Sequence, residues 1–332
     1  MCYRFVRMKS WQVHAFCEPE QMTLDDVPVP VPGAHEVRIR NHAAALNFFD
    51  ILQIQGKYQV RPPFPFTPGA EVSGTVDAVG AEVKHVFPGD PVMAMTHNGA
   101  FAEYSLAASN RTFHAIAGMD FAEAAAMPVV YHTSYFALHR RAGLAHGEWL
   151  LVHAGASGVG MAAIQIGKAY GARVIATAGT QAKLDFCLAQ GADHALLYSG
   201  AGWVEHVKEI TNGRGVDVVY DPVGGDVFDL STRAIAPEGR MLVIGFASGR
   251  IPSVPANRIL LKDISIVGVH WGQYVQQHPE FLAHTHEVLT AMYLGGQLHP
   301  VVGKIFRLDE VPAGLRELAD RKILGKAVAT ID

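Results

Sequence analysis

The chain has 332 residues, of which 49% are hydrophobic, and this is enough for two domains with cores of their own. Its formal net charge of −4 is spread without long runs of one sign, so nucleic acid and anionic membranes are disfavoured as partners. No run reaches the roughly 18 apolar residues that a membrane span needs. We therefore expect the partners to be small molecules and other copies of the chain.

The three cysteines, Cys2, Cys17 and Cys187, show no CxxC spacing. This argues against a disulfide framework and against a cysteine zinc site, so we expect a reducing, cytoplasmic location. The basic N-terminus MCYRFVRMKS is not followed by the apolar segment of a signal peptide. Met8 is an alternative start, because the first strand-like pattern, WQVHAF, begins just after it.

From Trp11 to about Ser109 the chain has the pattern of an antiparallel, loop-rich β domain. EVRIR alternates apolar and polar residues, and EVSGTVDAV and PVMAM are short β-rich runs. Segments rich in proline and glycine, such as VPVPVPG and PPFPFTPG, separate these runs. The alanine-rich stretch FAEAAAM, which begins at Phe121, then predicts a helix.

From Glu148 onward, apolar strands alternate with helical segments. This alternation is typical of a parallel sheet with crossover helices, and six strands fit a doubly wound dinucleotide-binding fold. The predicted strands are residues 149–154, 173–178, 194–198, 216–221, 240–246 and 264–271. After Trp271 we expect a long helix to about Leu294, a short helix, and a final strand, KAVATI, that returns to the first domain.

The strongest local signal is LLVHAGASGVGMAAIQIGKAYGARVIATAG, residues 150–179. A strand, a glycine-rich turn, a helix and a second strand follow one another in the order that a nucleotide pyrophosphate needs. Gly155 opens the turn, while Gly158 and Gly160 allow close backbone approach and tight helix packing. Ser157 replaces the middle glycine of the simplest motif, which leaves GxSGxG. The unpaired N–H groups of the helix N-terminus would bind the anion.

The end of the second of these strands decides between NADH and NADPH. An NAD enzyme carries a carboxylate there for the ribose 2′-hydroxyl, whereas this chain has Ala178, Gly179 and Thr180. Lys183 follows within one turn and would neutralise a 2′-phosphate. The sequence therefore favours NADPH, although Lys183 taken alone also fits a solvated surface lysine.

Motifs along nearly the whole chain from about Met8 resemble the medium-chain dehydrogenase/reductase superfamily, and within it the zinc-free quinone oxidoreductases related to zeta-crystallin. They are, in order, LNFFD, QGKY, PFTPGAEVSGTVDAVG, GAFAEY, AGASGVG, GADHALLY, GRGVDVVYDPVGG and VIGFASG. The resemblance implies an α/β protein with a GroES-like, mainly antiparallel β catalytic domain (residues 1–128 and 273–332) and a Rossmann NADPH-binding domain with a doubly wound parallel sheet (residues 129–272). It also implies a homodimer or tetramer joined through the edge strand ISIVGVHW.

The zinc-dependent alcohol dehydrogenases of this superfamily carry a cysteine where this chain has Asn47, and a histidine where it has Ala70. A further ligand cysteine, near residues 131–133, is also missing, and VMAMTHNGAFAEYS lacks the cysteines of the structural zinc lobe. Tetrahedral zinc needs three or four ligands, which Asp50 alone cannot supply. The resemblance therefore implies a zinc-free protein.

The resemblance also assigns cofactor contacts. Lys183 and Tyr198 match the residues that hold the 2′-phosphate, and Ser157, Gly158 and Val159 match the pyrophosphate turn. The remaining expected cofactor contacts are Asn47, Thr133, Gly155, Gly160, Gly179, Gly245, Phe246, Ala247, Ser248, His270, Trp271 and Lys326. The expected substrate pocket is formed by Leu52, Tyr58, Tyr131, His270 and Trp271. Many relatives carry a tyrosine at the place of Leu52, so Tyr58 becomes the better candidate for a pocket hydroxyl.

Hydride transfer depends mostly on position, and an acceptor with a conjugated carbonyl system needs no zinc Lewis acid. Tyr58 would either donate a hydrogen bond to the product oxyanion or pack as a wall of the pocket. Asn47 would hold the nicotinamide ribose, while Asp50 would cap a helix or orient Asn47. For Tyr131 and Trp271, core packing is an open alternative to a place in the pocket. Structural roles are expected of His132, His153, His270 and Asp221.

The sequence thus predicts an NADPH-dependent, zinc-independent reductase, with Tyr58 and Asn47 as candidate catalytic residues and quinones or α,β-unsaturated carbonyl compounds as substrates. Two alternatives stay open. One is an enoyl-thioester reductase of the enoyl-CoA type. The other is an NADPH-binding sensor or RNA-binding protein with low turnover, against which the mildly acidic charge argues.

Overall fold

The computed structural model describes residues 6–332, which form two compact units. The first unit comprises the described residues up to Val129 together with Pro300–Asp332, and the second comprises Val130–His299. By contacts, residues 273–299 group with the second unit, whereas the sequence assigned them to the GroES-like domain; that assignment stays a prediction. Among residues 6–332, no helix is both long enough and apolar enough to cross a membrane.

The first unit is built on a seven-stranded sheet of order β14-β15-β3-β4-β5-β7, with β6 paired to β3. All its pairings are antiparallel except that of β14 with β15, so the expected mainly antiparallel β domain is confirmed. The strands are β3 (Glu36–Leu46), β4 (Glu71–Val79), β5 (Pro91–Met95), β6 (Tyr104–Ala108), β7 (Thr112–His114), β14 (Val302–Arg307) and β15 (Lys326–Thr330), and a two-stranded sheet pairs β1 (Arg7–Gln12) with β2 (Thr23–Pro28).

The core of this unit lies on the face of the sheet to which the alternating apolar residues point. In β3, for example, Val37 and Ile39 are fully buried, while Arg40 is exposed. Three helices, α1 (Phe48–Ile54), α2 (Phe121–Ala126) and α11 (Val311–Ala319), contact this sheet or one another. β15 pairs with β3 in antiparallel fashion, Ala327 opposite Leu46, which confirms that the final strand returns to the first domain.

The second unit contains the predicted six-stranded parallel sheet, in the order β10-β9-β8-β11-β12-β13. This is the order of a doubly wound dinucleotide fold. Every residue of the central strands β8 and β11 is buried, as expected of strands covered on both faces. The strands are β8 (Trp149–Val152), β9 (Arg173–Ala178), β10 (His194–Leu197), β11 (Val216–Asp221), β12 (Ile235–Val243) and β13 (Ser265–Gly268).

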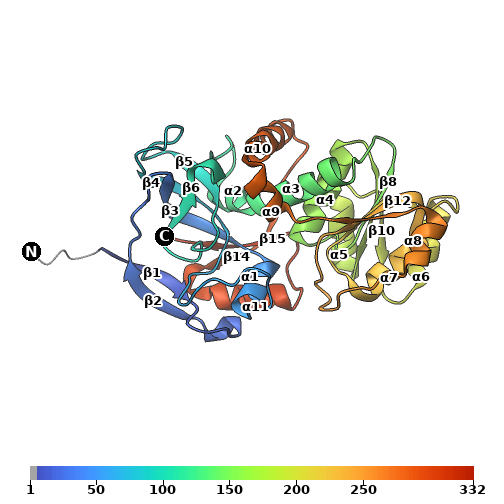
Figure 1. Cartoon of the computed structure of the whole chain (residues 1–332), viewed down its shortest axis with the longest axis horizontal. Helices are drawn as coiled ribbons and strands as arrows, with labels where there is room; N and C mark the ends of the chain where they lie inside the picture. The colour runs from blue at the N-terminus through green and yellow to red at the C-terminus, as the bar shows by residue number, and fades with distance from the viewer. Residues whose placement is uncertain (1–5) are drawn as a thin grey trace, which may run out of the picture. The chain divides into compact units, whose positions relative to one another are not determined.

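Helices connect and flank these strands, as Figure 1 shows for the green-to-orange part of the chain. They are α3 (Pro128–Tyr135), which starts in the first unit and continues into a π-helical segment (Phe136–Arg141), α4 (Gly158–Ala169), α5 (Gln181–Ala189), α6 (Gly202–Ile210), α7 (Gly225–Ala234) and α8 (Ala256–Lys262). The long helix expected after Trp271 is instead two helices, α9 (Trp271–Gln277) and α10 (Pro279–Leu294). Pro279 explains this difference, because it has no N–H to continue a helix and suits the first turn of a new one.

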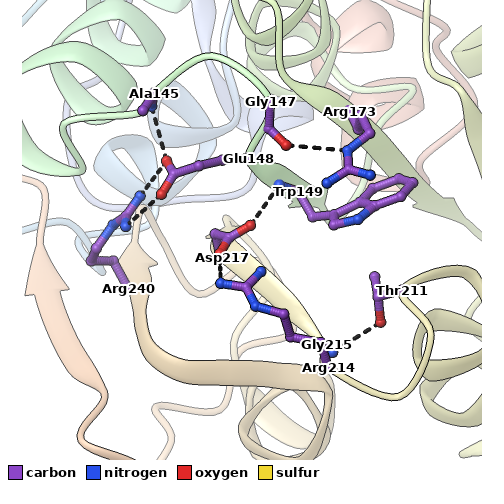
Figure 2. Close-up of polar contacts among 10 residues, drawn as sticks. All are labelled: Ala145, Gly147, Glu148, Trp149, Arg173, Thr211, Arg214, Gly215, Asp217 and Arg240. Carbon is purple, nitrogen blue, oxygen red and sulfur yellow. Dashed lines mark hydrogen bonds and ion pairs between the residues drawn. The ribbon is translucent and has the colours of Figure 1, made fainter.

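Near the amino ends of the parallel strands, a set of polar contacts links β8, β11 and β12 and the residues just before them (Figure 2). Arg240 donates to both carboxylate oxygens of Glu148, at 2.9 and 2.6 Å. Asp217 accepts from the backbone N–H of Trp149 at 2.8 Å and from Arg214 at 2.5 Å. The guanidinium of Arg173 lies 4.3 Å from the centre of the Trp149 ring. Ligands of open α/β sheets bind at the carboxyl ends of the strands. These contacts therefore lie at the opposite edge of the sheet.

Candidate functional site

The glycine-rich turn connects β8 to α4 in a conformation that only small residues permit. Ala154 has a φ of 49°, and Ser157 is the N-cap of α4, where its hydroxyl accepts from the N–H of Gly160 at 3.1 Å. A Cβ on Gly160 would lie 2.2 Å from the carbonyl oxygen of Ala154, and one on Gly155 would lie 2.7 Å from the sulfur of Cys187. The predicted roles of these glycines in close packing therefore have a structural basis, and the N-terminus of α4 fits a pyrophosphate.

Two residues predicted to contact the cofactor, Gly179 and Tyr198, lie close together at the carboxyl ends of β9 and β10, and Lys183 follows in the next helix. Thr180 caps α5, which puts Lys183 in the first turn of that helix. A Cβ on Gly179 would lie 3.8 Å from the hydroxyl of Tyr198, and the N–H of Tyr198 donates to the carbonyl of Ala178. The corner formed by Gly179, Lys183 and Tyr198 holds no carboxylate of its own, so it suits a phosphate better than a ribose hydroxyl.

A cavity of about 520 Å³ adjoins this corner, lined by Tyr198, Gly200, Ala201, Asp226, Val227, Asp229 and Leu230. Its two carboxylates are paired with Arg250, at 2.8 Å for Asp226 and 2.5 Å for Asp229. The single guanidinium of Arg250 offsets one of the two carboxylate charges, so this part of the cavity keeps a negative charge.

The turns after β11 and β12 are joined by backbone hydrogen bonds. Ala247 donates to the carbonyl of Pro222, and Ser248 donates to that of Val223, which fixes the predicted contact segment Gly245–Ser248. Asp221 accepts from the N–H groups of Val223 and Gly224, at 2.7 and 3.0 Å, as its expected turn role requires. Burial raises the pKa of Asp221 to about 6.

The remaining predicted residues of the second unit differ in exposure. His270 is exposed and precedes α9, with its Nδ1 2.9 Å from the side-chain oxygen of Gln273. Trp271 and Thr133 are half-buried. Tyr131 is fully buried, and its hydroxyl donates to Gln165 at 2.8 Å. This contact favours core packing for Tyr131, the alternative that the sequence left open, and its place in a substrate pocket stays a prediction.

Two buried histidines have the structural surroundings that the sequence suggested. His153 lies in the core of the second unit, where its ring nitrogens are 2.7 Å from the hydroxyl of Thr177 and 2.8 Å from that of Ser231. Burial lowers the pKa of His153 to about 3, so it is neutral at physiological pH. His132 is fully buried and stacks on His286, with 5.6 Å between ring centres.

In the first unit, Asn47 and Asp50 form the capping box of α1. The backbone N–H of Asn47 donates to Oδ2 of Asp50 at 2.8 Å, and the backbone N–H of Asp50 donates to the carbonyl oxygen of Asn47 at 3.1 Å. This arrangement supports the expectation that Asp50 caps the helix. Both residues are buried, with Asn47 exposed by only 6%.

The side chain of Asn47 belongs to a buried cluster with Glu71 and Lys326. The ammonium of Lys326 donates to the side-chain oxygen of Asn47 at 2.7 Å and to Oε1 of Glu71 at 2.6 Å. The amide nitrogen of Asn47 donates to the same Glu71 oxygen at 2.8 Å, and the other Glu71 oxygen accepts from the N–H of Val129 at 2.7 Å. Lys326 thus holds Asn47 in place from within the first unit, and its predicted approach to a cofactor stays a prediction.

Glu71 is a member of this cluster that the sequence reasoning missed. The one available signal was an acidic residue at the first position of the β-rich run EVSGTVDAV, where a fully buried carboxylate needs a cationic partner. Its partner is far away in the chain, so local patterning gave no reason to single it out.

Leu52 lies on α1, and Tyr58 lies just after this helix in the chain. The chain turns back after α1, and the N–H of Tyr58 donates to the carbonyl of Leu52 at 3.1 Å. The half-buried Tyr58 ring lies 5.5 Å from that of Phe49, and its pKa is raised by burial and by the nearby charge of Asp50. The structure therefore brings the two candidate catalytic residues, Asn47 and Tyr58, to the same helix.

Within residues 6–332, no group of three or more His, Cys, Asp or Glu side chains is arranged to hold a metal ion. The expected absence of zinc rests on the residues at the ligand positions, Asn47 and Ala70, and stays a prediction.

Two family models match the chain. The model of the family described as alcohol dehydrogenase GroES-like domain matches residues 33–134. The model of the family described as zinc-binding dehydrogenase matches residues 158–287. Quinone oxidoreductase-like protein 2 of Mus musculus is 38% identical over 316 residues, which cover 94% of this chain and 89% of the mouse protein.

Solved structures with the same fold include two reductases. Escherichia coli quinone oxidoreductase, solved in complex with NADPH, has a TM-score of 0.91 and 28% identity, covering 97% of this chain and 99% of the other. The CurK enoyl reductase has a TM-score of 0.90 and 28% identity, covering 98% of this chain and 100% of the other.

Proposed function

Because this chain belongs to the quinone oxidoreductase family of medium-chain dehydrogenases/reductases, we propose that it is an NADPH-dependent, zinc-independent reductase of quinones or α,β-unsaturated carbonyl compounds. When bound, NADPH supplies the hydride. The residues of the chain would bind and orient the cofactor and the acceptor, exclude water, and provide the proton that completes the reduction.

The observation that carries this proposal is the corner at the ends of β9 and β10. The turn after β8 is shaped for a pyrophosphate, and the place of an NAD-type carboxylate is taken by Ala178 and Gly179. Lys183 and Tyr198 stand beside that place, which favours a 2′-phosphate. The NADPH complex of the Escherichia coli relative supports the same cofactor.

The cofactor assignment is tested by Lys183→Ala. We expect the Michaelis constant for NADPH to rise roughly 10-fold or more, while that for NADH changes little, because only NADPH carries the 2′-phosphate. Lys208→Ala is the matched control, since Lys208 lies on α6 and pairs with Glu205 at 3.3 Å. Equal effects of Lys183→Ala on both cofactors would contradict the assignment.

Zinc independence is supported by what replaces the ligand cysteine of the zinc-dependent relatives. Asn47 stands at that position, and its amide is bonded to Lys326 and Glu71. A carboxamide held in this way is a poor zinc ligand compared with a thiolate. Steady-state assays with a quinone panel and an enone panel, with and without a chelator, would measure both the acceptor class and any metal requirement.

A second candidate function is reduction of enoyl thioesters, and the similarity to the CurK enoyl reductase supports it. The discriminating assay adds enoyl-CoA substrates to the two panels. Turnover of the thioesters alone would replace quinones and enones as the substrate class. If NADPH binds and none of the three substrate classes is reduced, the result favours the sensor or RNA-binding alternative. A salt-dependent gel shift with RNA then tests RNA binding.

We also propose a homodimer that joins second units through the edge strand β13. The neighbouring helix α8 buries none of its side chains, and Leu260 and Leu261 on it are 74% and 79% exposed. Ile251, just before α8, is 72% exposed. Large apolar side chains grouped in this way are typical of a protein–protein contact.

A further inference from the structure

His153 directly follows β8 and is the last residue before the glycine-rich turn, residues 154–157. Its backbone N–H donates to the carbonyl of Tyr220, on the neighbouring strand β11, at 3.0 Å. The next residue, Ala154, has a φ of 49°, a left-handed conformation that is unfavourable for a residue with a side chain. Such a conformation persists where the surrounding contacts hold it in place. The contacts of the His153 side chain therefore bear on the shape of the turn.

The ring of His153 is fully buried and contacts three elements of the second unit. Its Nδ1 lies 2.7 Å from the hydroxyl of Thr177 on β9, and its Nε2 lies 2.8 Å from the hydroxyl of Ser231 on α7. Trp203, on α6, packs against the ring at a distance of 5.1 Å between ring centres and an interplanar angle of 75°. One side chain thus connects the end of β8 to a strand and two helices.

The hydrogen bonds fix the orientation of this ring. Ser231 donates its only hydroxyl hydrogen to the carbonyl of Val227 at 2.7 Å, so its oxygen accepts from Nε2–H of His153. A neutral imidazole carries one N–H, and Nδ1 therefore accepts from the hydroxyl of Thr177. Turning the ring over would break both bonds, so the ring has one favoured position.

Thr177 is bonded to the residues on both sides of Ala154. Its hydroxyl donates to the ring of His153, and its carbonyl accepts from the N–H of Gly155 at 2.9 Å. Thr177 is also the second residue before Gly179, which belongs to the corner formed by Gly179, Lys183 and Tyr198. These two bonds therefore set the distance between the turn after β8 and this corner.

The other ring nitrogen connects the same turn to the cavity beside Tyr198. Ser231 lies on α7, and Val227, whose carbonyl accepts from Ser231, is one of the residues that line the cavity. The turn, the corner and one wall of the cavity are thus joined through a single buried ring.

We propose that His153 is a positioning residue for the cofactor, which holds the corner formed by Gly179, Lys183 and Tyr198 at a fixed place relative to the turn after β8. The proposal deepens the NADPH-binding function proposed above and rests on it. The pyrophosphate and the 2′-phosphate belong to one molecule, so both are bound at once only if the two segments keep the right spacing. Because it is fully buried, His153 acts through Thr177 and the turn.

The test compares the dissociation constants of NADPH and NADH, which differ only in the 2′-phosphate. Thr177→Val keeps the shape of the side chain but removes the hydroxyl that bonds to His153. We expect the dissociation constant of NADPH to rise roughly 10-fold and that of NADH to rise less than about 2-fold. Thr177→Ser keeps the hydroxyl and should retain the preference of the unchanged protein for NADPH. Fluorescence titration with each reduced cofactor measures both constants without turnover.

Thr211→Val is the matched control, because it removes a buried threonine hydroxyl elsewhere in the same unit. Thr211 donates to the carbonyl of Val207 at 2.8 Å and accepts from the N–H of Gly215 at 2.9 Å (Figure 2). This variant should lower the melting temperature but leave the preference for NADPH unchanged. A merely structural bond between Thr177 and His153 predicts the same result for Thr177→Val, and that result would overturn the proposal.

His153→Phe removes both ring bonds together and should reduce the preference for NADPH at least as strongly as Thr177→Val. If this variant does not fold, the comparison of Thr177→Val with Thr177→Ser still decides. If the unchanged protein prefers NADPH but reduces no acceptor, the reductase function fails, while the titrations still decide the role of His153. An unchanged protein that binds both cofactors equally would refute the cofactor assignment and the positioning role together.

Discussion

The ammonium group of Lys326 lies 2.6 Å from a carboxylate oxygen of Glu71, although the two residues are 255 positions apart in the chain. Lys326 is 3% exposed and Glu71 is fully buried. The pair joins the last strand of the chain to β4 and fixes the amide of Asn47 between them. A position that binds metal in zinc-dependent relatives is thus held by an internal ion pair.

Replacing only Lys326 should lower the free energy of unfolding far more than replacing both partners of this pair. Lys326→Met leaves the Glu71 carboxylate buried without its cation, and we expect a loss of about 3–5 kcal/mol in the free energy of unfolding. The double variant Lys326→Met with Glu71→Gln should recover most of that loss. Lys304→Met is the control, because Lys304 pairs with Glu317 at the surface and should cost less than about 1 kcal/mol. Urea unfolding at pH 7 measures all three, and equal losses in the single and double variants would contradict the prediction.

The buried neutral histidine His153 should make the protein less stable in acid. Its pKa is about 3 in the folded chain and near the ordinary 6.5 in the unfolded chain. The unfolded chain therefore binds more protons between pH 6.5 and 3, so the stability present above pH 6.5 is lost as the pH falls, by up to about 1.4 kcal/mol per pH unit.

The measurement for His153 is the melting temperature from pH 7.5 to pH 4.5. His153→Gln should show a shallower decline, because glutamine keeps polar contacts with Thr177 and Ser231 but binds no proton. His286, whose pKa burial lowers to about 4, retains its own share of the decline. Parallel curves for the two proteins would show that His153 does not contribute.

Gly160→Ala should weaken cofactor binding by distorting the turn after β8. The added methyl group would lie 2.2 Å from the carbonyl oxygen of Ala154, so the turn must shift away from the N-terminus of α4. We expect the dissociation constant for NADPH to rise at least about 10-fold, or 1.4 kcal/mol. Gly202→Ala, at the start of α6, is the matched control because nothing lies within 4 Å of its Cβ position. Fluorescence titration with NADPH compares the two.

The proposed dimer predicts that charges on α8 separate the subunits. Leu260→Glu combined with Leu261→Glu would place two carboxylates in the apolar contact, and sedimentation should then report a monomer. Ile305→Glu is the control, because Ile305 is an exposed apolar residue, 56% exposed, in the first unit. If Ile305→Glu separates the subunits and the α8 variant does not, the contact lies elsewhere.

Local patterning of the chain was sufficient for the strands of the second unit. Period-two and apolar runs predicted all six parallel strands. This succeeded because a buried strand consists of consecutive apolar residues that are visible in the local sequence. The same approach predicted one helix after Trp271 where Pro279 starts a second, although proline without an N–H is a local signal that could have been used. The glycines of the turn after β8 were likewise readable, since strand and helix flank them in the sequence.

The sequence by itself determined the two-part organisation, the parallel sheet, the phosphate turn and the absence of an acid from residues 178–180. Only the tertiary structure decided which side chains meet Asn47 and Asp50. The contacts among Glu71, Lys326 and Asn47 join strands and a helix start distant in the chain, and no local period records such pairings. The raised pKa of Asp50 depends in the same way on burial, which exists only once the chain has folded.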